Sequence, residues 1–455
     1  MRRAVLALLL AGGCATTKPD GPRREVGELV AGRSGLRDPI AVTQDARARA
    51  AVRERVASLL QGPLTVERAL QIALLNNRAL QAELEELGVA QAELVEAGLL
   101  ENPVFSADLV NSTRGNGLGG GLALSTSLLS AFLIPAKRRL AKAHLRHTVV
   151  EVAHEALALV RDVRVAYAHA QAAHAELMLR RELVQAAELA AELARRQHDA
   201  GNLPELDRER FAAALDDARL SLADYELART VAREELNRLL GLWGSQLDWR
   251  LPADTGAAGL PAPPAAEAEL ATLESQGVRE RLDVSGARAD VDAMRLALAL
   301  RRRGVVPQIE AGIDVRNEVG NDAGHEWVLG PSVSIEIPIF DPGHADFAAL
   351  QARLRQAQHA LQHAAIVARS EIREQRERLL VARRKADYFT TEVLPRRAAI
   401  VSRALEQYNG MLMGTYELLE TRKAQVEAQH EQVIALRDYW VARAQLELAV
   451  GGRLP

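Results

Sequence analysis

The sequence predicts a mainly helical protein with a small β part, built from two copies of one helical-hairpin unit. Residues 136–200 contain neither glycine nor proline and are rich in Ala, Leu, Glu and Arg, which are strong helix formers. Four short segments instead alternate apolar and polar residues, as strands do. Landmark prolines and glycines recur at an offset of 204 to 210 residues, which indicates an internal duplication.

The long segment 136–200 is expected to form one unbroken helix on the order of 100 Å long. Its apolar residues alternate at steps of four and three, and so do those of residues 211–239, apart from Arg229. This spacing is typical of helices that wind around neighbours as coiled coils. The turn Gly201, Asn202, Leu203 and Pro204 separates the two runs, so we expect an antiparallel hairpin.

A second hairpin is predicted downstream. No glycine occurs between Gly343 and Gly410, and a returning helix runs to Val450. The turn between them spans residues 408–414, and Pro395 is expected to kink the outgoing helix because it lacks an N–H group.

The N-terminus has the pattern of an exported chain. Arg2 and Arg3 precede an apolar run and small residues, so residues 1–13 are interpreted as a signal peptide. Cys14, the lone cysteine, follows in a pattern that resembles a bacterial lipobox, which implies a lipid on Cys14 and sorting to the outer membrane. The alternative is a plain signal peptide with an incidental cysteine. Residues 14–62 are expected to form an extended, lipidated tether.

The rest of the chain divides into two repeats. Residues 63–242 form the first, with Thr65 as the N-cap of a helix that is expected to end near residue 101. Residues 243–270, rich in Pro, Ala and Gly, form a linker, and residues 271–452 form the second repeat. Each repeat is predicted to contain a helix, two strands and a long helical hairpin.

The strands are predicted in pairs, each before a long helix. The first pair covers residues 104–110 and 121–130, and the second covers 307–315 and 332–339, where Trp327 and Phe340 flank the last strand like an aromatic girdle. A soluble sheet is the alternative reading. Four strands cannot close a membrane barrel, since the smallest have about eight, so a spanning barrel would need several chains.

Composition excludes some functions. The chain has 57 Lys and Arg against 60 Asp and Glu, so its charge gives no reason to expect nucleic-acid binding. No apolar run approaches the ~18 residues of a transmembrane helix, so any membrane passage is expected to use strands. Nucleophile elbows, phosphate-binding glycine loops and His-Glu-x-x-His patterns do not occur, so we expect neither an enzyme nor a cofactor.

With these features in order, the chain resembles the TolC-like outer-membrane efflux proteins over nearly its whole mature length. The residues that carry the resemblance are Leu64-Thr65, Ala69, Ala73, Asn77, Tyr167, the Gly201 turn, Arg281 to Val284, Tyr408 to Gly410, Tyr416 to Glu420 and Ala449 to Gly452. The resemblance implies a homotrimer with one shared 12-stranded barrel in the outer membrane and a helical tunnel in the periplasm. It also implies an adaptor protein docked on the hairpin tips and an inner-membrane pump, often of the resistance-nodulation-division type.

Two sets of tip residues are candidate functional sites. Glu417 and Glu420 share a helix face, and a threefold axis would gather six carboxylates into a cation-preferring gate; the alternative is an ordinary solvated face. The residues expected to dock the adaptor are Gly201, Asn202, Leu203, Pro204, Gly410, Met411, Leu412, Met413 and Gly414.

Histidines at helical spacing are weaker candidates for metal binding. They are His144, His147 and His154 in the first long helix, and His359 and His363 in the second. No complete ligand set is visible in the sequence, so no metal site is assigned.

The expected function is therefore a passive exit duct for small toxic compounds, either drugs or metal ions. The alternatives are an exit duct for type I protein secretion and a non-conducting structural coiled-coil lipoprotein of the periplasm.

Overall fold

The computed structural model describes residues 20–36, 45–111, 118–253, 259–303, 309–319, 325–335, 340 and 343–454. The predicted signal peptide and Cys14 lie outside these residues. The described chain divides into two compact units. The first contains residues 20–25, 84–151 and 283–364, and the second contains 26–83, 152–282 and 365–454.

A four-stranded antiparallel sheet belongs to the first unit, in the order β1-β2-β3-β4. Its strands are β1 (Val104–Asn111), β2 (Leu118–Ser127), β3 (Ile309–Val319) and β4 (His325–Ile335). Since β2 pairs with β3, the sheet joins strands from both repeats. The predicted strand pairs are therefore confirmed, with shifted bounds.

The last strand differs most from the prediction. It begins at His325 and contains Trp327, which pairs with Asn317, so Trp327 lies inside the strand rather than beside it. Pro331 obscured this strand in the sequence, and a proline is tolerated here because β4 is an edge strand. Residues 336–339 lie outside the described part of the chain.

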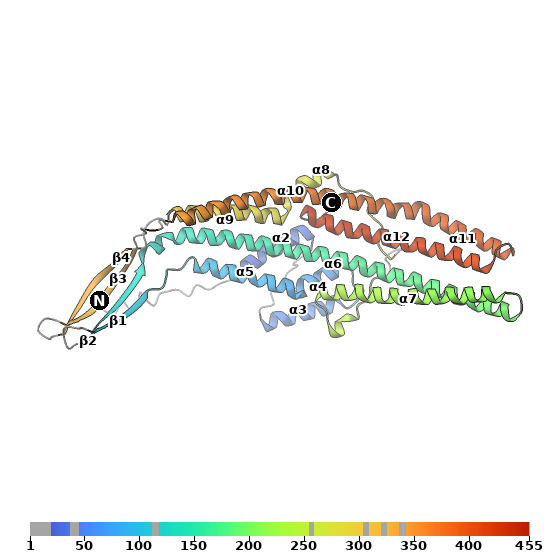
Figure 1. The fold of residues 1–455 in the computed structure, drawn as a ribbon, viewed down its shortest axis with the longest axis horizontal. Coiled ribbons are helices and arrows are strands. Elements are labelled where there is room, and N and C mark those ends of the chain that lie inside the picture. The colour runs from blue at the N-terminus through green and yellow to red at the C-terminus, as the bar shows by residue number, and fades with distance from the viewer. Residues whose placement is uncertain are drawn as a thin grey trace. The chain divides into compact units, whose positions relative to one another are not determined.

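The two long hairpins are confirmed (Figure 1). In the first, α6 (Leu128–Asp199) turns into α7 (Glu205–Leu240). Helix α6 begins earlier than predicted and contains Pro135; Ser127 caps it by accepting a hydrogen bond from Ser130 N. In the second, α10 (His344–Tyr388), the π-helical turn η2 (Phe389–Val393) and α11 (Leu394–Asn409) lead to α12 (Thr415–Val450).

The predicted disturbance at Pro395 takes the form of that π-helical turn. Pro395 lies in the first turn of α11 and cannot donate to the carbonyl four residues earlier, so the regular ladder is interrupted just before it. The hydroxyls of Thr390 and Thr391, in the π-helical turn, donate to the carbonyls of Ala386 and Asp387.

The predicted first helix is two helices, α4 (Val66–Asn76) and α5 (Arg78–Glu96), so the expectation of a single helix is wrong. Asn77 has an extended backbone, and its side-chain oxygen accepts a hydrogen bond from Leu80 N at 3.0 Å. Its amide donates to the Leu239 carbonyl at 2.9 Å. The break lets Asn77 cap both the start of α5 and the end of α7.

The second repeat has the same break. Helices α8 (Leu270–Glu280) and α9 (Leu282–Arg303) are separated by Arg281, whose guanidinium donates to Glu371 at 2.6 Å and to the Ala449 carbonyl at 3.3 Å. In each repeat, the end of the last helix therefore contacts the residue that separates the first two helices.

The expectation of an extended tether over 14–62 is wrong for its described part. Helices α2 (Asp20–Ser34) and α3 (Ala46–Leu59) occupy most of it. Val26 and Val30 are fully buried, and the Arg33 side chain donates to the Glu280 carbonyl. Gly27 and Gly32 lower the helix propensity of the segment that forms α2. Burial of Val26 and Val30 against the rest of the chain stabilises this helix.

The linker is packed within the second unit. Trp249 lies under the Arg233 guanidinium, and Leu260 is buried with Ala172, Ala386, Val433 and Leu436. The short helix η1 (Gly244–Leu247) precedes Trp249. Glu267 accepts hydrogen bonds from Tyr439, Arg383 and Arg443, which ties the linker to α10 and α12.

Within the described ranges, no helix combines the length and the apolar composition that crossing a membrane requires.

Candidate functional site

The tip of the first hairpin ends α6 in the predicted way. Gly201 has a left-handed backbone, with φ of 77°. Its N–H donates to the His198 carbonyl, and Asn202 N donates to the Gln197 carbonyl, each at 2.8 Å. This pair of bonds is a Schellman motif, in which glycine is favoured at the left-handed position.

The second tip makes the same two backbone hydrogen bonds. Its left-handed residue, however, lies one position after the glycine that the sequence suggested. Met411 N donates to the Tyr408 carbonyl and Leu412 N to the Gln407 carbonyl, each at 2.9 Å. Met411 is left-handed, with φ of 61°, whereas Gly410 is not. The structural equivalent of Gly201 is therefore Met411, not Gly410.

We expect Met411→Gly to stabilise the second tip. A left-handed backbone costs a residue with a side chain on the order of 1–2 kcal/mol, and the Met411 side chain is 94% exposed, so its removal loses little packing. Thermal unfolding followed by circular dichroism should show a higher midpoint. Leu412→Gly is the control, because Leu412 is also exposed and has no positive φ. A lower midpoint for Met411→Gly than for the wild type would contradict the prediction.

The two tips pack together within the second unit. Phe211 of α7 and Leu419 of α12 are buried in one cluster with Ala190 and Ala194 of α6. The Phe211 and Tyr416 rings meet edge to face, with centroids 5.5 Å apart. A cavity of about 700 Å³ lies between the tips, lined by residues that include Asp207, Arg210, Tyr408, Met411 and Met413.

Most of the predicted docking residues are accessible. Met411 and Leu412 are 94% and 82% exposed, while Leu203 and Met413 are half-buried. The Leu203 carbonyl lies 3.0 Å from His198 Nδ1, which holds the first turn in place. Their role in docking an adaptor stays a prediction.

Glu417 and Glu420 are both exposed on α12, on either side of the buried Leu419. Neither carboxylate forms an ion pair with another residue of the described chain. The equivalent positions of the first hairpin, 210 residues earlier, are Asp207 and Arg210, which pair with each other at 3.1 Å. Only the second tip therefore carries two uncompensated negative charges at these positions.

The predicted histidines are dispersed. His147 Nδ1 lies 3.1 Å from Asp290, and its Nε2 lies 3.5 Å from Glu151. His144, His359 and His363 are exposed, and His154 is half-buried. None of these five belongs to a group of three close metal-ligating side chains among the described residues.

A different polar cluster lies where α6, α7 and α12 meet. Arg180 donates to Glu427 and to the Tyr225 hydroxyl, both at 3.1 Å, and its guanidinium stacks over the Tyr225 ring. His430 Nε2 lies 3.4 Å from the Tyr225 hydroxyl, and His430 Nδ1 lies 3.8 Å from Glu176. This cluster joins the two hairpins through charged and aromatic groups.

Burial changes the ionisation of this cluster. It lowers the pKa of His430, and the nearby Arg180 lowers it further. It also raises the pKa of the Glu176 carboxyl, against the opposing effect of Arg437 and Arg180. His430 is therefore neutral at pH 7, with one ring nitrogen free to accept.

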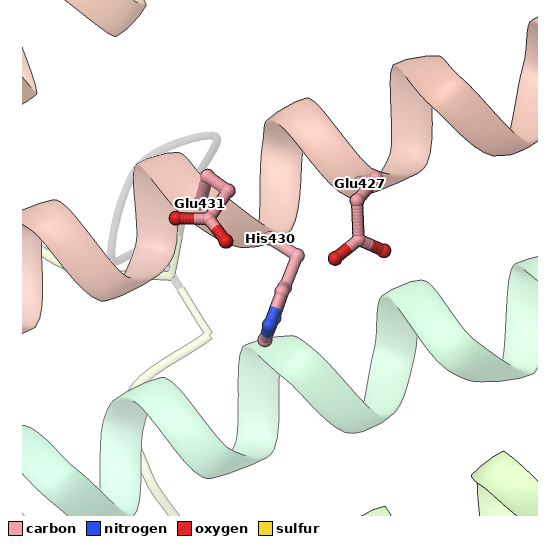
Figure 2. Close-up of side chains that lie close together, drawn as sticks. All are labelled: Glu427, His430 and Glu431. Carbon is pink, nitrogen blue, oxygen red and sulfur yellow. The ribbon is translucent and has the colours of Figure 1, made fainter.

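Figure 2 shows that Glu427 and Glu431 flank His430 on α12. One ligand atom from each of the three lies within 4.8 Å of the others. Sequence reasoning missed this group, although its spacing of three and four residues places all three on one helix face. The signal was present in the residues 427–431, but an isolated helix gives no indication that His430 is buried.

Comparison with known proteins agrees with this architecture. Residues 69–242 match the outer membrane efflux protein family. A Pseudomonas aeruginosa membrane protein is 17% identical, with 91% of this chain and 92% of that chain covered and a TM-score of 0.69. The Campylobacter jejuni CmeC outer membrane channel is 15% identical (94% and 92% covered, TM-score 0.69), and VceC from Vibrio cholerae is 16% identical (89% and 97% covered, TM-score 0.65).

The fold is thus that of a TolC-like channel protein, as the sequence predicted. The family match covers residues 69–242, and the similarity to the solved channels extends over the fold of most of the chain.

Proposed function

We propose that this protein is the outer-membrane component of a tripartite efflux system. In this role it is a passive exit duct for small toxic compounds, drugs or metal ions, and catalyses no reaction. Three copies assemble, their strands close a 12-stranded barrel, and their hairpins form a periplasmic tunnel. A periplasmic adaptor docks on the tips, and an inner-membrane pump of the resistance-nodulation-division type delivers the cargo.

The observation that carries this proposal is the continuous apolar face of the sheet. Cross-strand partners share a face, and the register aligns Phe105 with Leu124, Leu124 with Ile313 and Ile313 with Pro331. The next row on this face contains Ala107, Leu122, Val315 and Leu329.

The side chains of this face are exposed in the single chain. Phe105 is 66% exposed, Leu329 70% and Val333 66%. The other face carries Ser106, Asp108, Asp314 and Ser332. An apolar outer face and a polar inner face suit a wall between lipid and water, and open edges at β1 and β4 need partners. Sister chains supply those partners in the proposed trimer.

The experiment is reconstitution of the purified full-length protein in planar lipid bilayers, together with its mass in detergent. We expect stepwise conductance from a particle with three times the mass of the chain. The control is Leu329→Asp with Val333→Asp, which places charges on the apolar face and should abolish insertion. A monomer that does not conduct would refute the proposal.

We also propose that a lipid on Cys14 anchors the chain in the outer membrane. We expect the mature mass of Cys14→Ser to lack the lipid, because the thiol is the acceptor in the lipobox pattern. Mass spectrometry of the membrane fraction measures this. Equal mature masses for wild type and Cys14→Ser would show that Cys14 is unmodified.

A further inference from the structure

We propose that His430, Glu427 and Glu431 bind a divalent transition-metal ion on α12, and that Glu176 of α6 lies next to it as a further carboxylate. The three α12 side chains offer one nitrogen and two oxygen ligands within 4.8 Å of one another. Their carboxylates lie on either side of the His430 side chain (Figure 2).

The buried imidazole is the observation that points to a ligand. His430 is 9% exposed, and its Nδ1 atom has no hydrogen-bond partner among the described residues. A buried polar atom left unsatisfied is unfavourable. A bound metal ion would give His430 Nδ1 the partner that it lacks.

The nearest carboxylate of α6, that of Glu176, does not satisfy the imidazole nitrogen. His430 Nδ1 and Glu176 Oε1 are 3.8 Å apart, which is too far for a hydrogen bond. Glu176 is not one of the three side chains whose ligand atoms all lie within 4.8 Å of one another, so it lies beside the proposed ion as a neighbouring carboxylate and not as one of its three ligands.

Charge around the imidazole is negative overall. Three carboxylates, those of Glu176, Glu427 and Glu431, lie near His430, against the guanidinium groups of Arg180 and Arg437. Arg437 also pairs with Asp438 at 2.8 Å. The negative charge of the cluster therefore favours binding of a cation, and no additional anion is needed to balance its charge.

The donor set selects the kind of metal. One imidazole with carboxylates suits Zn²⁺ and its neighbours Co²⁺ and Ni²⁺, whereas Mg²⁺ and Ca²⁺ prefer oxygen ligands only. Glu427 and Glu431 are exposed, so the ion would exchange with solvent. Because Arg180 already binds Glu427, a bound ion would also compete with this link between α6 and α12.

The test is titration of the chelator-treated, full-length protein with Zn²⁺ by isothermal calorimetry, with Mg²⁺ as the counter-probe. We expect one Zn²⁺ per chain and no heat with Mg²⁺. Glu431→Gln should weaken Zn²⁺ binding at least tenfold, and His430→Ala should abolish it. His359→Ala, which removes an exposed histidine of α10, should leave binding unchanged.

Co²⁺ provides a second readout, since its visible absorption reports imidazole and carboxylate coordination directly. Glu431 is exposed, so Glu431→Gln leaves the fold intact and keeps the test valid if His430→Ala misfolds. Wild-type binding no stronger than that of Glu431→Gln, or an equal loss in His359→Ala, would overturn the proposal. Neither measurement depends on conductance, so the result is independent of the proposed channel function.

Discussion

Gly451→Ala is expected to destabilise the protein by on the order of several kcal/mol, because a strained backbone and an overpacked contact both add to the cost. Gly451 ends α12 with φ of 81°, which disfavours any side chain. An added Cβ would also lie 2.8 Å from Arg281 N and 2.8 Å from the Glu280 carbonyl carbon. Both are backbone atoms at the break between α8 and α9, so neither can move aside cheaply.

The measurement is the midpoint of denaturant unfolding, followed by circular dichroism. Gly241→Ala should behave alike, because Gly241 has φ of 66° and its added Cβ would lie 2.7 Å from the Asn76 carbonyl oxygen. Gly201→Ala is the matched control: its φ is 77°, but no atom lies within 4 Å of its added Cβ. Gly201→Ala should lower the free energy of unfolding only by the cost of the left-handed backbone, about 1–2 kcal/mol. Equal losses at Gly451 and Gly201 would show that the contact contributes nothing.

Neutralising Glu417 and Glu420 together should reduce the cation preference of the pore and its block by multivalent cations. In the proposed trimer, six carboxylates surround the axis at the second tip, and such a ring favours cations. Both side chains are exposed and lie off the packed face that Leu419 occupies. Assembly should therefore be unchanged in Glu417→Gln, Glu420→Gln.

The first hairpin supplies the control for this experiment. Asp207→Asn with Arg210→Gln removes an ion pair at the equivalent positions and leaves the net charge unchanged. Reversal potentials in a salt gradient measure the selectivity of each variant in planar bilayers. We expect a large shift for the glutamate pair and little for the control. The same reversal potential in the glutamate variant and the wild type would show that Glu417 and Glu420 are part of an ordinary solvent-exposed helix face with no role in selectivity.

Local sequence was sufficient to predict the long helices and the first tip. A long stretch that lacks glycine and proline and is rich in strong helix formers favours a continuous helix. The Gly201 turn ends α6 by its own backbone preference, with no need of a partner. The strands were also predictable, because alternation along residues 309–315 directly encodes an apolar face.

Other features depended on contacts between distant residues. The break at Asn77 exists because its side chain also caps α7, 162 residues away. Helix α2 depends on buried valines and on the contact of Arg33 with Glu280, which no local pattern reports. The left-handed Met411 is similar: its bonds match those at Gly201, but nothing in its residue type indicates them.

The sequence by itself determined the fold class of this protein, since helix propensity, strand alternation and the duplication are all local or periodic properties. Tertiary structure alone decided the positions of side chains from different helices. It buried His430 beside Glu176 of α6 and paired Arg180 with Glu427. The physical reason is that burial and ion pairing depend on residues about 250 positions apart, whose approach is set by the packing of whole hairpins.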